Sequence, residues 1–104
     1  MNGWELGTLG WELAILRIID SLQRTRETVS TEDIYMALEE GTSRELTRRD
    51  LREVSQWGRR PAYQYRVRSY LSTLARGKRP SLERVSRGVY RMTDHGKWRI
   101  RHDF

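Results

Sequence analysis

The chain has 104 residues, enough for one domain with a hydrophobic core and too few for a second folded unit, so we expect a single domain over residues 1–104. It has no cysteine and only two histidines, which excludes disulfides and thiolate metal sites, and we expect no cofactor. The net charge of +6 is unevenly divided: residues 1–43 carry −5 (3 basic, 8 acidic) and residues 44–104 carry +11 (17 basic, 6 acidic). Such a basic half indicates a partner that is a polyanion, most often nucleic acid.

The first predicted element is an amphipathic helix over residues 9–22. Its apolar residues recur three to four positions apart, and this spacing predicts that Trp11 is packed in the core. The longest apolar stretch within it, residues 13–19, contains Arg17 and is too short to cross a membrane. The first five residues lack the pattern of a signal peptide, so we expect a soluble cytoplasmic protein, associated with the nucleoid.

Two later segments share one helix-start pattern: an apolar residue, a Ser or Thr, two spacers, an Asp and a second apolar residue. They are Val29–Ile34 and Leu46–Leu51, and each is followed by a helix-like pattern that ends at a glycine. In such a pattern the hydroxyl caps the first turn, and the Asp side chain binds the amide of the capping residue. The sequence therefore predicts a helix at each segment, with Asp33 and Asp50 as caps rather than catalytic carboxylates.

A further helix is predicted to begin near Pro61, which suits a first helical turn, and to end at Ala75, before Gly77. Its apolar stripe consists of Tyr63, Val67, Tyr70, Leu71 and Leu74. At about 100° per residue, the opposite face is polar and cationic, and it consists of Tyr65, Arg68, Ser69 and Ser72 with Gln64 and Arg66 on the flanks. This face is suited to a nucleic-acid groove.

A β-hairpin is predicted next. Residues 82–85 and 89–93 are two short β-prone runs, joined by residues 86–88, in which Gly88 can adopt a positive φ. Because Arg87 lies in the joining segment, the tip of this hairpin is cationic.

The last part of the chain, residues 94–100, has no clear period. We expect it to turn and to pack Trp98 or Ile100 back onto the helices.

Three or four helices followed by a basic hairpin is the order of a winged helix-turn-helix, an α+β fold that is mostly α. In this arrangement the helix at 61–75 enters the major groove of duplex DNA, and the wing at 82–93 contacts the backbone or the minor groove. The candidate DNA-binding residues are Arg60, Gln64, Tyr65, Arg68, Ser69 and Ser72 in the helix and Lys78, Arg79, Arg84, Arg87 and Arg91 in the loop and wing. Arg68 suits guanine, Gln64 suits adenine, and the serine hydroxyls suit a base edge or a phosphate.

A family resemblance supports the same fold. The stretches Tyr65–Leu74 and Leu82–Thr93, with Gly96, resemble the N-terminal winged-helix domain of Mrr-type restriction systems and related modules fused to restriction endonucleases. The most specific part is Arg87–Thr93, which matches an arginine-glycine wing turn and a strand of the pattern Tyr-x-hydrophobic-Thr-x-x-Gly. The resemblance implies recognition of a target site, including modified DNA, with Tyr65 either facing a base methyl group or packing on the wing.

The chain also departs from that family. No nuclease domain with an Asp and Glu-x-Lys cluster follows, so cleavage is not implied. The predicted helix at 47–57 and the long basic loop at 77–81 are additions to a minimal winged helix.

The sequence bears on two other classes of function. An enzyme is disfavoured because the residues it would need are scarce: the chain has two histidines near the C-terminus, no cysteine, no glycine-rich phosphate loop and no metal-ligand spacing. A protein-interaction winged helix remains the alternative, in which the acidic half and the four tryptophans, including Trp4, form a homodimer or bind a partner protein. Steep salt dependence of duplex binding separates a DNA module from an interaction module.

Overall fold

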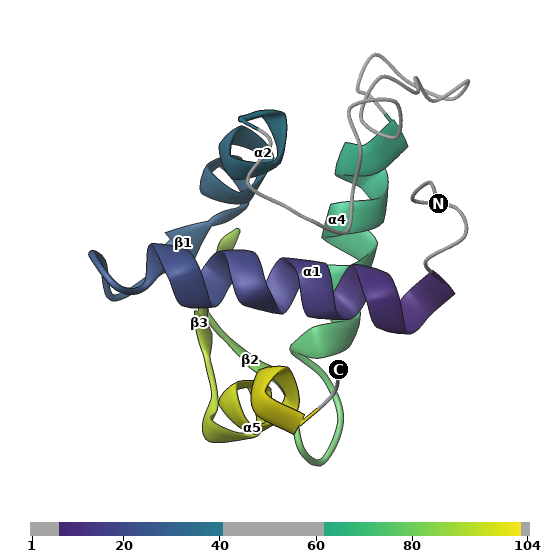
Figure 1. The fold of residues 1–104 in the computed structure, drawn as a ribbon, viewed down its shortest axis with the longest axis vertical. Coiled ribbons are helices and arrows are strands. Elements are labelled where there is room, and N and C mark those ends of the chain that lie inside the picture. The colour runs from purple at the N-terminus through teal and green to yellow at the C-terminus, as the bar shows by residue number, and fades with distance from the viewer. Residues whose placement is uncertain (1–6, 41–61, 103–104) are drawn as a thin grey trace.

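The computed structural model describes residues 7–40 and 62–102. Within these ranges the elements are α1 (Gly7–Leu22), β1 (Val29–Ser30), α2 (Thr31–Glu39), α4 (Ala62–Leu74), β2 (Leu82–Ser86), β3 (Val89–Met92) and α5 (Asp94–His102) (Figure 1). The fold is therefore α+β and mostly helical. The predicted helix at 47–57 lies outside the described residues. Among the helices that the structure describes, none is long and apolar enough to span a bilayer.

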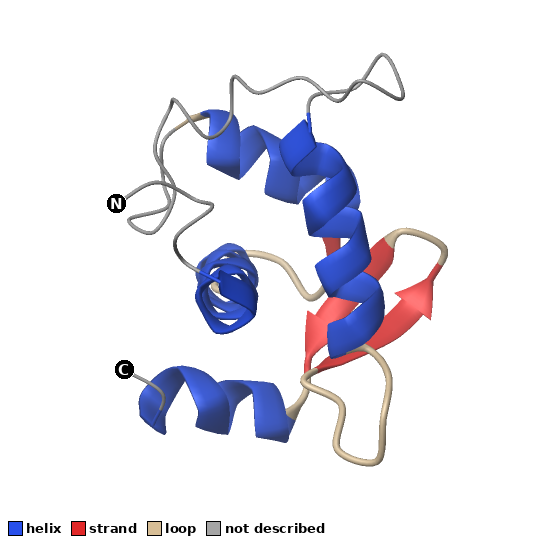
Figure 2. Ribbon diagram, turned by 90° about the vertical axis from the view of Figure 1, so that its right-hand side faces the viewer, coloured by secondary structure: helices blue, strands red, loops and turns tan. Residues whose placement is uncertain are grey.

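Helix α1 forms the centre of the core. It packs against α2, α4, α5 and β3, and Figure 2 shows it end-on between α5 and the pair α2 and α4. The helical spacing predicted from the sequence is confirmed, because Ile15, Leu16 and Ile19 are fully buried and Trp11 is only 3% exposed. The ring of Trp11 stacks on Tyr70 of α4. The predicted stripe of α4 faces this core, with Tyr63, Val67, Leu71 and Leu74 buried and Tyr70 partly buried.

A capping box starts α2, as the sequence predicts. The Asp33 amide donates to Ser30 Oγ at 3.1 Å, and the Ser30 amide donates to Asp33 Oδ2 at 2.9 Å. That backbone hydrogen bond, helped by the Ser30 hydroxyl and by Arg26 at 3.1 Å, lowers the pKa of the Asp33 carboxyl below its ordinary value. The carboxylate is therefore a structural cap.

The sheet has one strand more than the predicted hairpin. Its order is β1-β3-β2 and both pairings are antiparallel, with Val29 opposite Tyr90 in the added pair. Strand β1 consists of two residues, too few for an alternating pattern, and Ser30 serves both as its end and as the cap of α2. The hairpin itself turns at Arg87 and Gly88, and Gly88 has the expected positive φ of 72°.

The C-terminal segment differs from the sequence-based expectation, because residues 94–102 form a regular helix, α5. The Thr93 hydroxyl accepts a hydrogen bond from the Gly96 amide at 3.1 Å and so caps this helix. Ile100 packs against the core as proposed, whereas Trp98 is 52% exposed and stacks between His95 and His102. A short basic helix with an internal glycine has neither the propensity nor the apolar period that would have revealed it.

Candidate nucleic-acid interface

The exposed face of α4 is the first part of the candidate site. Arg68 and Ser69 are exposed on it, and Tyr65 is 40% exposed. Tyr65 and Ser69 point away from the core, because Val67, about 200° from each of them around the helix, is buried. Arg68 precedes Leu71 by about one turn and lies at the side of the helix between these two faces. Arg60, which was predicted to join them, lies outside the described residues.

Two other predicted residues of α4 are engaged within the protein. The side-chain amide of Gln64 donates to Tyr63 Oη at 3.3 Å, and Tyr63 in turn donates to Glu39 Oε1 at 2.6 Å. Ser72 is bound by Arg76, whose Nε donates to the Ser72 carbonyl at 3.1 Å and whose Nη2 donates to the Ser72 hydroxyl. Arg76 is exposed and was missed by the sequence analysis, although it lies one turn beyond Ser72 on the same face.

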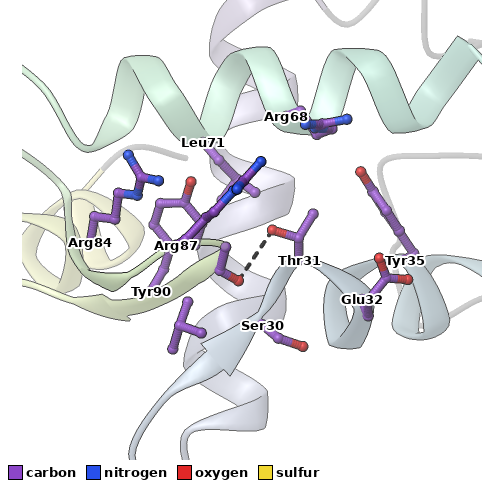
Figure 3. A pocket seen from close by; sticks show the side chains of 11 residues that line it. Ser30, Thr31, Glu32, Tyr35, Arg68, Leu71, Arg84, Arg87 and Tyr90 are labelled. Carbon is purple, nitrogen blue, oxygen red and sulfur yellow. Dashed lines mark hydrogen bonds between the residues drawn. The ribbon is translucent and has the colours of Figure 1, made fainter.

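A cavity of about 560 Å³ lies where the N-terminus of α2, helix α4 and the hairpin meet (Figure 3). Three arginines line it: Arg68 from α4, Arg84 from β2 and Arg87 from the hairpin turn. Figure 3 shows the side chains of Arg84 and Arg87 extending from the hairpin towards α4. The rest of the lining is formed by Ser30, Thr31, Glu32, Tyr35, Leu71, Gly88, Val89 and Tyr90.

The strand register explains why Arg84 faces this cavity. Arg84 lies opposite Tyr90, and both share the hairpin face that also carries the buried Leu82 and Met92. The register shifts between Arg84 and Ser86, which brings the chain to the turn that carries Arg87.

The opposite face of the hairpin carries a neutralised cation. Arg91 lies directly across from Glu83, and its Nε donates to Glu83 Oε2 at 2.6 Å. This hydrogen bond raises the pKa of Arg91 and lowers that of Glu83. Arg91 was predicted to belong to the same basic surface as Arg84 and Arg87, but the pleat places it on the other side.

Hydrogen bonds hold the hairpin turn against α2. The Thr31 amide donates to the Gly88 carbonyl at 2.9 Å, and the Thr31 hydroxyl donates to the same oxygen at 3.3 Å. The turn is therefore fixed beside the start of α2, a contact that joins residues 57 positions apart. The sequence pattern predicts the cap at the start of α2 but contains no signal for its contact with the hairpin turn.

The cavity arginines lack acidic partners among the described residues. Arg68, Arg84 and Arg87 are exposed, and none of them forms an ion pair with a residue that the structure describes. Glu32 is the single carboxylate in the described lining, and it forms no ion pair with them. Lys78 and Arg79 add exposed positive charge in the loop before β2. The arrangement is chemically suited to binding an anion.

Comparison with known proteins finds no matching family model, no matching curated protein and no matching solved structure. Within residues 7–40 and 62–102, no three His, Asp or Glu side chains form a group that could hold a metal ion. The function is therefore argued from the geometry and charge of this chain.

Proposed function

We propose that this domain is a winged helix that binds duplex DNA, with α4 as the helix in the major groove and the β2–β3 hairpin as the wing. Support for the fold comes from the chain order, in which β1 links α1 to α2 and the hairpin follows α4. The pairing of β1 with β3 places the hairpin beside α2, so that the exposed side of α4 and the hairpin turn adjoin one cavity.

The observation that carries the proposal is that exposed arginines from α4 and the hairpin line one cavity and form no ion pair with the carboxylates that the structure describes. Unpaired guanidinium groups bind phosphate with two parallel hydrogen bonds, and their summed field attracts a polyanion. Helix α4 has 13 residues and is about 20 Å long, a length that fits along a major groove.

Roles can be assigned within this surface. Tyr65 and Ser69, at the most outward positions of α4, face the bases, where the tyrosine ring offers an apolar surface to the methyl group of thymine or of a modified base. Lys78 and Arg79, with the arginines of the cavity, contact the backbone, which positions the helix without reading sequence.

The test is a titration of a fluorescent duplex with the protein, followed by anisotropy at several salt concentrations between about 50 and 200 mM. Contacts to about 4 to 6 phosphates give a plot of log K against log salt with a slope of about −4 to −5. The control is a variant that loses one positive charge outside the proposed interface. Arg101→Ala, at an exposed position on α5, should keep the affinity within about twofold of wild type. A slope near zero, or no binding in 50 mM salt, contradicts the proposal.

The interaction module remains a second candidate because of one observation. Trp98, with an exposed fraction of 52%, is stacked between two histidines on α5, a helix that lies on the opposite side of α1 from α2 (Figure 1). Large exposed aromatic rings are enriched in protein interfaces. This candidate predicts a concentration-dependent mass in light scattering that Trp98→Ala abolishes, together with salt-insensitive or absent DNA binding.

A further inference from the structure

We infer that Arg68, Arg84 and Arg87 bind a single phosphate group together in the cavity between α2, α4 and the hairpin. The inference deepens the proposed function and rests on it, in that it takes the phosphate to be part of the DNA backbone. It differs from the sequence-based expectation, in which Arg68 reads guanine and the wing contacts the backbone or the minor groove.

The convergence of three cations on one cavity is the first argument. The three side chains come from different elements, and each could point into open solvent, yet all three line the same space of about 560 Å³ (Figure 3). Like charges that share a site repel one another, and Glu32 alone among the described lining residues carries an opposing charge. A bound anion removes that repulsion, and a phosphate has enough oxygens to accept from several guanidinium groups at once.

The rest of the cavity lining favours the arginines as the groups that bind the ligand. Leu71, Val89 and the ring of Tyr90 add apolar surface to the lining, and apolar surroundings strengthen an ionic contact by lowering the local dielectric constant. Two hydroxyls in the lining already have acceptors, because that of Thr31 donates to Gly88 and that of Tyr35 donates to the Gln64 carbonyl.

Two backbone amides at the start of α2 are already bound within the protein. The Thr31 amide is bound to Gly88, and the Asp33 amide is bound to the cap at Ser30. We therefore assign the phosphate donors to the arginine side chains of α4 and the hairpin, which line the cavity together.

A phosphate of the DNA backbone and a phosphate of a free nucleotide offer the same chemistry to this cavity. The three arginines are exposed, so the anion can remain part of a polymer that runs along α4 and the hairpin. For this reason we assign the site to a phosphodiester of bound duplex and test the free ligand separately.

The experiment compares the salt dependence of duplex binding for wild type and for the triple variant Arg68→Ala, Arg84→Ala and Arg87→Ala. A phosphate contributes about 0.9 to the slope, so a shared phosphate predicts that the triple variant is less steep by about 0.9, and three separate phosphates predict about 2.7. Each single variant lowers the affinity by about five- to tenfold on any sequence, and the combined loss is less than the product of the three losses. A slope change near 2.7 with multiplicative losses overturns the inference.

A second arm identifies the phosphate. Duplexes that carry one uncharged methylphosphonate linkage at successive positions are titrated with both proteins. We expect one methylphosphonate position to lower the duplex affinity of wild type to that of the triple variant. The same position should leave the affinity of the triple variant unchanged. If every linkage weakens both proteins equally, the shared site is refuted.

A third arm separates the failure of this inference from the failure of the proposed function. Inorganic phosphate and pyrophosphate are added to wild type without DNA, and the arginine Nε–H signals are followed by NMR. If duplex does not bind but pyrophosphate shifts all three signals together, the anion site stands, its source is a free phosphorylated ligand, and DNA binding is wrong. If DNA binds steeply but the triple variant binds as wild type does, DNA binding stands and the shared site is wrong. Melting curves followed by circular dichroism confirm that the triple variant is folded.

Discussion

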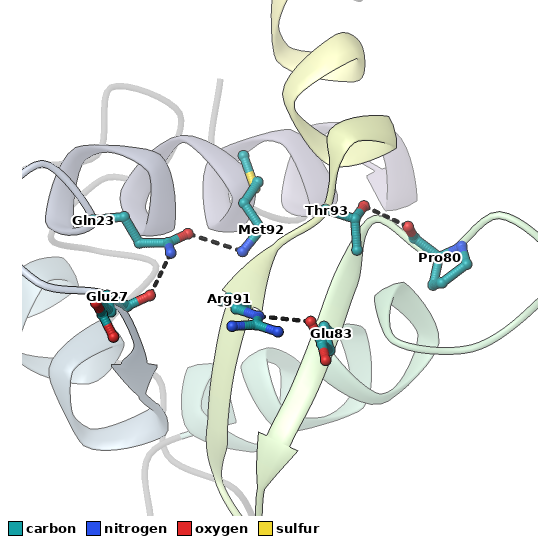
Figure 4. A network of polar contacts seen from close by, with 7 residues as sticks. All are labelled: Gln23, Glu27, Pro80, Glu83, Arg91, Met92 and Thr93. Atoms are coloured by element: carbon teal, nitrogen blue, oxygen red, sulfur yellow. Dashed lines mark hydrogen bonds and ion pairs between the residues drawn. The ribbon is translucent and has the colours of Figure 1, made fainter.

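The two ends of the β2–β3 hairpin differ in how their polar groups are bound. At its base, where β2 begins and β3 ends, the polar groups bind one another: Thr93 Oγ1 donates to the Pro80 carbonyl at 2.6 Å, and the Met92 amide donates to Gln23 Oε1 at 2.8 Å (Figure 4). At its tip, Arg84 and Arg87 reach a cavity without forming an ion pair to any described residue. The polar groups at the base are bound within the protein, whereas we propose that the tip binds the ligand.

Cations follow the same division. Arg91 pairs with Glu83 on the outer face of the hairpin, and Arg99 of α5 donates to Ser81 at 3.1 Å and lies 3.7 Å from Glu12. A basic residue is thus no marker of binding by itself. Changes at the base should lower stability, and changes at the tip should lower affinity while leaving stability unchanged.

The largest effect on stability is expected at Gly96, where α5 lies against the start of β2. A Cβ added there would lie 2.2 Å from the Ser81 carbonyl oxygen, a backbone atom that also accepts the Thr93 amide. Gly96→Ala should therefore cost about 3 kcal/mol of unfolding free energy and lower the melting temperature by about 10 °C or more. Thermal unfolding measures the loss, with Lys97→Ala on the exposed side of α5 as the control. A cost below about 1 kcal/mol would mean that the base is not closely packed.

At the tip, Arg87→Ala should weaken duplex binding about tenfold on every sequence, because the protein loses a contact to a phosphate and keeps its contacts to the bases. Its unfolding free energy should stay within about 0.5 kcal/mol of wild type, since the side chain is exposed and forms no ion pair with a residue in the described ranges. Anisotropy on specific and random duplexes, beside a urea melt, checks both halves of the prediction. A loss of stability without a loss of affinity would show that the tip stabilises the fold and does not bind DNA.

The cap of α2 tests whether a residue beside the tip can be purely structural. Ser30→Ala removes the hydroxyl that accepts the Asp33 amide and should cost about 1 kcal/mol. Thr25→Ala, at an exposed turn, is a matched loss of a hydroxyl with a smaller cost. Per folded molecule, the Ser30 variant should bind DNA as wild type does; a tenfold loss would assign the hydroxyl to the binding site.

The smallest effect concerns Tyr63, which links α4 to α2 through Glu39. Burial raises the pKa of Tyr63 to about 12, so its contribution to stability is fully present below pH 10 and is lost as the pH rises towards 12. Wild type should therefore lose stability relative to Tyr63→Phe across this alkaline range. Urea melts between pH 9 and about 11.5 measure the difference, and parallel curves for the two proteins would contradict it.

Local patterns in the sequence predict much of this fold. The cap at Ser30, the buried stripe of α4 and the turn at Gly88 depend on residues within a few positions of one another, and all three are found in the structure. Helix α5 was missed because its start depends on Thr93 and its fit on the absence of a side chain at Gly96, and neither produces a periodic signal.

The candidate site could be predicted only in part. Alternation along β2 places Arg84 on the same face of the hairpin as Leu82. Alternation along β3 places Arg91 and its neighbour Tyr90 on different faces. The sequence therefore already predicts that Arg84 and Arg91 are separated. It does not predict the cavity, because the cavity requires the hydrogen bond between Thr31 and Gly88, which joins distant parts of the chain.

The most direct test of the central claim is a map of amide chemical shifts as duplex is added to the labelled protein in low salt. The account predicts that shifts concentrate on the exposed face of α4, on residues 84–88 and on Thr31, while α5 and the hairpin base at Leu82 and Met92 stay unchanged. Shifts centred on α5 around Trp98, with the hairpin tip unaffected, would contradict it.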